Sequence, residues 1–241
     1  MLKKVEQMSN NKGEKMKKHL HEIWMGVAVT LIIILSIIAK TPIIKIIASV
    51  CGVIYILGVA KENRTSQIFG FVNTAIYAYL MLKDGVYGSA IYNGLYCLPM
   101  LVSTYINWGK NSNDKDNKKL KVATYSHTTR CYLIMAAIAI ITIYYAIAVK
   151  LGVNYALVDA IVITCGAFGM YAISKKHIEQ WYAFIIVNIA NITMWLTESF
   201  KDPSNATMVL MFVIYMINNI YGLKTWRGSR KYDRNKAKKE A

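Results

Sequence analysis

The stretch WYAFIIVNIANITMW, residues 181–195, is apolar enough to lie in a membrane, yet it carries two asparagines and a tryptophan at each end. On a helix, residues at positions i, i+3 and i+7 share one face. Trp181, Phe184, Asn188, Asn191 and Trp195 follow that spacing along the whole segment. The segment is therefore predicted to be a membrane helix with both asparagines and both tryptophans on the same face.

The rest of the chain repeats this apolar character. Of the 241 residues, 55% are hydrophobic, and the mean hydropathy of +0.32 is too high for an ordinary soluble domain of this size. Apolar runs of about 20 residues, enough to cross a ~30 Å hydrocarbon core as helix, recur between short charged segments. They predict eight transmembrane helices, at 22–40, 42–60, 66–83, 85–108, 131–149, 153–173, 178–197 and 205–225. The first run holds no small-residue cleavage site, so we expect a retained helix rather than a signal peptide.

The net charge of +16 is concentrated on one side of these predicted helices. Of the 29 Lys and Arg residues, 24 fall in the two terminal segments and the even-numbered loops, four fall on the other side, and Lys45 lies within a span. By the positive-inside rule, both termini are predicted to be cytoplasmic. The basic segments are interpreted as orientation signals that also contact anionic lipid, and no nucleic-acid partner is expected.

An internal repeat is indicated by three markers. The hydrophilic segment 109–130 divides the spans four and four; CG recurs at 51–52 and 165–166, VN at 72–73 and 187–188, and a closing Trp at 108 and 226. Corresponding helices of such a repeat would run in the same direction, related by an axis along the membrane normal. The predicted fold is an all-α integral membrane bundle, 1 + (3+1+3), with these segments: 1–21 cytoplasmic basic N-terminus, 22–40 extra first helix, 42–108 first three-helix repeat, 109–130 cytoplasmic loop, 131–149 linker helix, 153–226 second three-helix repeat, and 227–241 basic cytoplasmic tail.

Polar and aromatic stripes on the repeat helices predict a binding site where the halves meet. The candidate residues on the other helices of the two repeats are Asn73, Tyr77, Asn93, Tyr96, Tyr215 and Asn218, and Asn73 and Asn188 are expected at matching depth. Amide groups beside aromatic rings, without fixed charge, suit a neutral or singly charged nucleoside-like solute. The alternative interpretation is that each Asn bonds a neighbouring helix and each Trp anchors the helix at a membrane interface.

Ionisable and metal-binding chemistry contributes little to the prediction. Asp159 is the ionisable residue deepest in a span. Its carboxylate is expected either to contact the solute, to relay a proton or to hydrogen-bond a neighbouring helix. Because no second carboxylate is available for a proton relay, facilitated diffusion is expected rather than proton coupling. The four cysteines show no CxxC motif and no histidine at ligand spacing, so neither disulfide, metal nor cofactor is predicted. No catalytic motif of an enzyme is present.

The segments GFVNTAIYAYLMLKDGVYGSAIYNGLYCLPM (70–100), DAIVITCGAFGMYAISKKHIEQWYAFIIVN (159–188) and YMINNIYGLKTW (215–226) resemble the PnuC-type nicotinamide riboside transporters of bacteria. The resemblance covers about residues 42–226. It implies a fold similar to that of SWEET transporters and a location in the bacterial cell membrane. It also implies passive import of a vitamin or nucleoside, which a cytoplasmic kinase then traps by phosphorylation. Trp181 and Asn188 are the positions carried over as ligand contacts.

Three positions depart from that family's pattern. Tyr105 and Phe184 stand where the family often has tryptophan, and Leu101 stands where many members have glutamine. The resemblance implies nicotinamide riboside as the substrate, and these departures leave a deoxyribonucleoside, thiamine or riboflavin as alternatives. A membrane receptor or scaffold is the alternative class of protein. Homo-oligomer formation is left open. Glycines at similar places in the two repeats favour rocking of one repeat against the other.

Overall fold

The computed structural model describes residues 23–24, 26–38, 42–83, 90–110, 121–201 and 206–240, and within these ranges the chain is helical, with no strand. The only sheet-like contact there is an isolated bridge between Ala123 and His177. The helices are Gly26–Ile38, α2 (Ile43–Ala60), α3 (Ser66–Lys83), a π-helix η1 (Tyr92–Cys97) that continues into α5 (Leu98–Lys110), α6 (His127–Lys150), α7 (Ala156–Ser174), α8 (Glu179–Ser199) and α9 (Ala206–Glu240). With η1 and α5 taken together, the described residues form eight helices, and the predicted all-helical fold is confirmed.

Four of the described helices are long and apolar enough to cross a membrane: Ile43–Ala60, His127–Lys150, Ala156–Ser174 and Met208–Tyr232. Gly26–Ile38 is apolar but shorter. The helices α3 and α8 carry the buried or half-buried amides Asn73, Asn188 and Asn191, and α5 has only 13 residues. Polar side chains in a membrane helix are tolerated where they face other helices.

Local signals set the ends of several helices. Pro42 immediately precedes α2, where its fixed φ and missing N–H cost nothing. Ser126 is the N-cap of α6, and its Oγ accepts a hydrogen bond from the backbone N–H of Thr129 at 3.1 Å. Gly152, in the turn after α6, has φ of 70°, which glycine adopts without steric cost.

Six of the described helices form a closed ring of contacts. Along the ring, α2 packs on α3, α3 on η1–α5, α5 on α7, α7 on α8, α8 on α9, and α9 on α2. The first triplet is α2, α3 and η1–α5; the second is α7, α8 and α9. The third helix of each triplet therefore contacts the first helix of the other.

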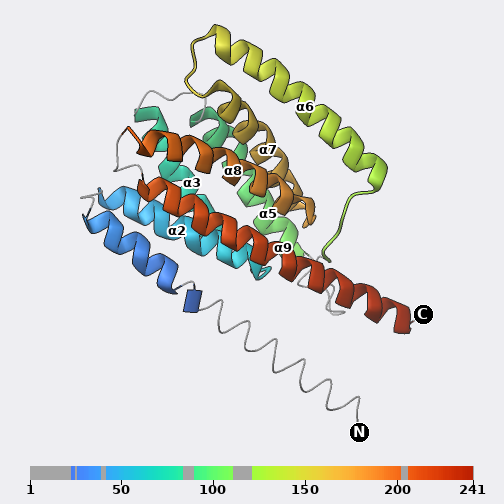
Figure 1. The fold of residues 1–241 in the computed structure, drawn as a ribbon. Helices are drawn as coiled ribbons and strands as arrows, with labels where there is room; N and C mark the ends of the chain where they lie inside the picture. Colours follow the sequence, from blue (N-terminus) through green and yellow to red (C-terminus); the bar gives the residue numbers. More distant parts are fainter. Residues whose placement is uncertain are drawn as a thin grey trace.

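Two of the described helices lie outside the ring. Figure 1 shows α6 along the outer edge of the bundle, and among the described elements it packs only on α7. Most of its apolar side chains are exposed, as expected of a helix that faces lipid. The helix Gly26–Ile38 packs through Ala28 and Ile32 against α2 and α9.

The last helix is longer than a membrane requires. Its 35 residues span roughly 52 Å at 1.5 Å per residue, against a hydrocarbon core of about 30 Å. The helix continues through the predicted tail, 227–241, as far as Glu240, and its last turns project beyond the other helices (Figure 1). We call the end of the ring from which α9 projects the tail end.

Candidate functional site

The middle of the ring holds two glycines on which polar side chains from other helices converge. A methyl group at Gly52 of α2 would lie 2.9 Å from Asn73 Nδ2 of α3 and 2.9 Å from Tyr215 Oη of α9. A methyl group at Gly166 of α7 would lie 2.6 Å from Tyr92 Oη of η1. In both triplets, a glycine in the first helix thus leaves room for a tyrosine hydroxyl from the third helix of the other triplet.

The π-helix η1 brings two tyrosines to the contact between the triplets. Tyr92 and Tyr96 stack with ring centroids 5.9 Å apart and an interplanar angle of 16°. Tyr96 Oη donates a hydrogen bond to the backbone oxygen of Ala167 at 2.7 Å. A single π-helical turn re-aims side chains relative to an α-helix and is frequent at functional sites.

Three of the predicted asparagines already have hydrogen-bond acceptors within the protein. Asn73 Nδ2 donates to Ala48 O at 2.7 Å, and Asn218 Nδ2 donates to Ile56 O at 3.1 Å. Asn191 Nδ2 donates to Val187 O of its own helix at 2.9 Å. For Asn73 and Asn218 these bonds hold α2 to α3 and α2 to α9.

Asn188 differs from these three. Its side chain is 4% exposed, and its Nδ2 has no hydrogen-bond partner in the part of the chain that the structure describes. The indole Nε1 of Trp181, on the same face of α8, and the hydroxyl of Thr164 on α7 are likewise buried without partners there. An unpartnered buried polar group costs about 1–3 kcal/mol, so these groups are available to a bound solute with hydrogen-bonding atoms.

Phe184 lies on the face of α8 that packs against α7. A methyl group at Gly169 would meet its ring at 2.9 Å. In the first triplet the ring comes from the first helix and the glycine from the second. Tyr55 of α2 packs on Gly70 of α3, where a methyl group would lie 2.7 Å from the ring. The two triplets thus fill corresponding space with an aromatic ring from different helices.

The remaining candidates lie elsewhere or are only half-buried. Asp159 Oδ2 accepts a hydrogen bond from Tyr144 Oη of α6 at 2.6 Å, which places this carboxylate at the contact between α6 and α7, outside the ring. Tyr77, Asn93 and Trp195 are half-buried, and a contact with solute stays a prediction for them.

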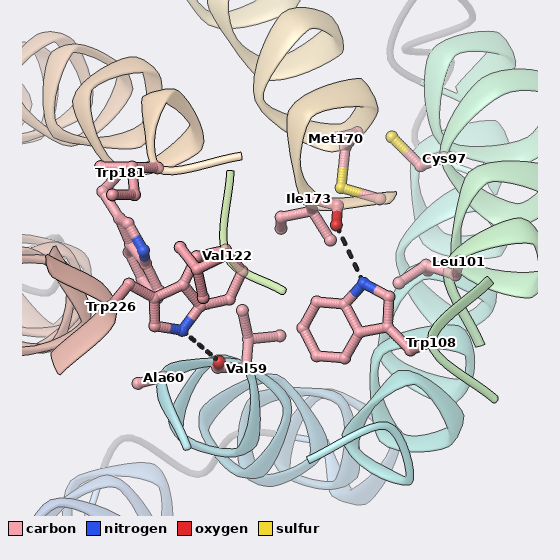
Figure 2. Close-up of a cluster of buried hydrophobic side chains, with 11 residues drawn as sticks. Val59, Ala60, Cys97, Leu101, Trp108, Val122, Met170, Ile173, Trp181 and Trp226 are labelled. Carbon is pink, nitrogen blue, oxygen red and sulfur yellow. Dashed lines mark hydrogen bonds between the residues drawn. The ribbon is translucent and has the colours of Figure 1, made fainter. Parts of the chain in front are cut away.

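At the tail end, three tryptophans fill the ring (Figure 2). The rings of Trp108 and Trp226 have centroids 5.8 Å apart, and Trp181 meets Trp226 edge-on at 5.4 Å. Trp181 is 2% exposed, so it does not anchor α8 at a lipid surface. From the sequence, Trp108 and Trp226 were visible only as repeat markers.

A charged pair lies beside this cluster. Lys176 Nζ forms a salt bridge with Glu62 Oε2 and lies 5.4 Å from the centroid of the Trp108 ring. Lys176 is 4% exposed. Sequence reasoning did not identify this pair, although its members are 114 residues apart, the same offset as the CG marker.

The segment before α6 closes over the turn between α7 and α8. Ala123 N–H donates to Lys176 O at 3.1 Å, and Ala123 O accepts from Ile178 N–H at 3.0 Å. Glu179 Oε1 accepts from Thr124 Oγ1 at 2.5 Å, from the Tyr125 N–H at 3.2 Å and from Arg130 Nε at 2.8 Å.

Two titratable side chains stack where the segment before α6 meets this turn. The rings of Tyr125 and His177 have centroids 3.9 Å apart. Burial lowers the pKa of His177, opposed by Glu179 and reinforced by Lys175. Burial, together with Tyr171 and Glu179, raises the pKa of Tyr125 to about 12. Both rings are therefore uncharged at neutral pH.

A ring of two three-helix units, with apolar outer surfaces and a polar and aromatic middle layer, defines a multi-pass membrane protein built to handle a small solute between its halves. A model of the nicotinamide mononucleotide transporter family matches residues 42–228. The chain belongs to this family of membrane transporters, which confirms the predicted family and the prediction of a transporter rather than an enzyme.

Individual relatives agree with this assignment. The chain is 22% identical over 212 residues to the nicotinamide riboside transporter PnuC of Neisseria mucosa, covering 86% of this chain and 81% of the relative. It is 20% identical over 184 residues to the nicotinamide riboside transporter PnuC of Haemophilus influenzae, covering 76% and 78%. A crystal structure of the vitamin B3 transporter PnuC has the same fold, with a TM-score of 0.74 at 21% identity over 89% of this chain and 93% of that one.

Proposed function

We propose that this chain imports nicotinamide riboside by facilitated diffusion. The observation that carries the proposal is the buried, unpartnered donor of Asn188 in a ring that also presents Tyr92, Tyr96 and Phe184. The carboxamide oxygen and ribose hydroxyls of nicotinamide riboside are acceptors for such donors. Its flat, positively charged pyridinium ring suits the faces of aromatic side chains. The printed names of the two relatives point to the same solute.

The passive mechanism is supported by the position of Asp159. Its hydrogen bond to Tyr144 of α6 engages the carboxylate outside the ring, and the spans offer no second carboxylate at comparable depth. A solute that moves down its own gradient accumulates only if it is removed on arrival. Phosphorylation by a cytoplasmic kinase would do so, since a phosphate group adds charge that the site does not match.

We place the protein in the bacterial inner membrane with the tail end in the cytoplasm. The concentration of 24 of the 29 Lys and Arg residues on one side supports this orientation. The basic residues of α9 beyond Trp226 would then lie among or below the anionic lipid headgroups.

Phe184 is the observation that favours the alternative solutes, a deoxyribonucleoside, thiamine or riboflavin. Its ring is smaller than the tryptophan that the family resemblance led us to expect, and it packs on Gly169 in the ring. The second such departure, Tyr105, lies under the guanidinium of Arg64, with Cζ 5.1 Å from the ring centroid. Tyr105 thus contacts the turn between α2 and α3.

The test is uptake of labelled nicotinamide riboside into proteoliposomes that contain only this protein, with and without an imposed proton gradient. Unlabelled nicotinamide riboside, thymidine, thiamine and riboflavin serve as competitors. We expect uptake that equilibrates without a gradient and that unlabelled nicotinamide riboside alone abolishes. Saturable uptake of a labelled competitor in place of nicotinamide riboside would overturn the substrate, and dependence on the proton gradient would overturn the mechanism.

A further inference from the structure

Two tryptophans at the tail end make equivalent hydrogen bonds across the contact between the triplets (Figure 2). Trp108 of α5 donates from Nε1 to the backbone oxygen of Ile173, in the last turn of α7, at 3.1 Å. Trp226 of α9 donates from Nε1 to the backbone oxygen of Val59, in the last turn of α2, at 3.1 Å. Each bond joins the third helix of one triplet to the first helix of the other, so an approximate two-fold rotation exchanges the two bonds.

Glu62 and Lys176 occupy equivalent places under the same rotation. Each is the second residue after the first helix of its triplet, and each has a left-handed backbone, with φ of 59° and 57°. A contact between two residues that a two-fold rotation exchanges has to lie on the axis. The salt bridge between Glu62 and Lys176 and the ring contact between Trp108 and Trp226 therefore both mark the axis of the ring.

These two contacts close the axis at the tail end. Trp226 is 0% exposed, Trp108 6% and Lys176 4%, so these three side chains are packed away from solvent, whereas the side chain of Glu62 is 23% exposed. Lys176 also lies over the face of Trp108, which joins the charged pair to the aromatic pair. A solute held between the triplets, at the depth of Gly52 and Gly166, has this layer between it and the tail end.

We propose that Glu62, Lys176, Trp108 and Trp226 form the gate through which solute passes at the tail end, and that the salt bridge positions the tryptophans in the closed state. Opening separates Glu62 from Lys176 and breaks the two indole hydrogen bonds together, because all of these contacts join one triplet to the other. Contacts within a triplet, such as that of Phe184 with Gly169, stay intact. The proposal needs only that a solute moves along the axis, whichever solute that is.

A native thiol reports the state of this gate. Cys97 is 5% exposed and belongs to the same buried cluster as Trp108 and Trp226. In a protein whose other cysteines, Cys51, Cys131 and Cys165, are replaced by serine or alanine, a membrane-impermeant maleimide added from the tail side reaches Cys97 only when the gate opens. The labelling rate requires no substrate, so its result is independent of the identity of the solute.

The experiment compares Glu62→Gln, Lys176→Glu and the double reversal Glu62→Lys with Lys176→Glu, in proteoliposomes labelled from either side. Removing one member of a buried charge pair destabilises the closed state, so we expect each single variant to raise labelling from the tail side by at least about tenfold. The double reversal restores an attractive pair and is expected to return labelling toward the starting rate. Lys201→Met, which breaks the exposed pair with Glu198, is the matched control and is expected to change nothing.

Either of two results would overturn the proposal. One is unchanged labelling in a folded Glu62→Gln protein, and the other is a folded double reversal that labels as fast as the single variants. If the charge variants do not fold, Trp108→Phe serves instead, because it keeps an aromatic ring while it removes the donor to Ile173 together with the smaller ring of the indole. We expect faster labelling from the tail side and unchanged labelling from the other side, and equal labelling of Trp108→Phe and the parent would also refute the gate.

Discussion

Replacing Asn188 by leucine separates a solute contact from a structural one. Leucine has nearly the shape of asparagine, and the Nδ2 that it removes has no partner in the described part of the chain. The folded protein therefore loses no hydrogen bond from that donor and is relieved of a desolvation cost of about 1–3 kcal/mol. If the donor serves the solute, binding loses about 1 to 1.5 kcal/mol, which corresponds to an affinity about five- to thirteenfold weaker.

Asn73→Leu is the matched control. Asn73 Nδ2 donates to Ala48 O of α2 at 2.7 Å, so this variant should lose an interhelical bond worth about 0.6–1.7 kcal/mol. The assay pairs thermal unfolding in detergent with titration of nicotinamide riboside. We expect unchanged or raised stability and weaker binding for Asn188→Leu, and lowered stability for Asn73→Leu. Equal destabilisation of the two variants, with unchanged binding of nicotinamide riboside to Asn188→Leu, would show that Asn188 has a structural role between helices.

Three further predictions concern other parts of the molecule. Gly166→Ala places a methyl group 2.6 Å from Tyr92 Oη, an overpacking that costs about 1–3 kcal/mol; uptake should fall, and adding Tyr92→Phe should recover it, unless the hydroxyl itself is needed. Asp159→Asn keeps an acceptor for Tyr144, so uptake should match that of the parent with and without a proton gradient; a slower rate would give the carboxylate a part in transport. Burial holds the pKa of His177 below its ordinary value of 6.5, so the unfolded chain binds more protons than the folded one as the pH falls below 6.5. Thermal stability should drop as the pH falls through 6.5 in the parent and drop less in His177→Gln, and parallel profiles would exclude this histidine as the cause.

The helices could be predicted from the sequence because the length of an apolar run is a direct physical requirement of the membrane. The predicted linker helix, 131–149, differs from α6 only at its ends, since the N-cap Ser126 starts the helix before the apolar run begins. The extension of α9 was not anticipated, because beyond Trp226 the helix consists of charged residues that give no apolar signal. The π-helix η1 could not be predicted from the sequence either, since one widened turn does not change which residues are apolar.

The candidate site was less accessible from the sequence. Helical spacing placed Trp181, Asn188 and Asn191 on one face, and all three are buried. Spacing does not reveal which amide is already bonded, because the acceptors of Asn73 and Asn218 are backbone oxygens of another helix, α2. The partner of Asp159 likewise comes from α6, which the repeat pattern treats as a linker.

The pair Glu62–Lys176 has a consequence for how such a ring can be assembled. In a homodimer of one triplet, each residue on the two-fold axis would meet its own copy, so position 62 would oppose glutamate to glutamate or lysine to lysine. Tryptophan tolerates such self-pairing, as Trp108 and Trp226 show, but like charges repel in a buried setting. An attractive ion pair on the axis is available only to a protein whose halves differ in sequence. Joining two triplets in one chain thus permits an electrostatic lock that two identical subunits are unable to form.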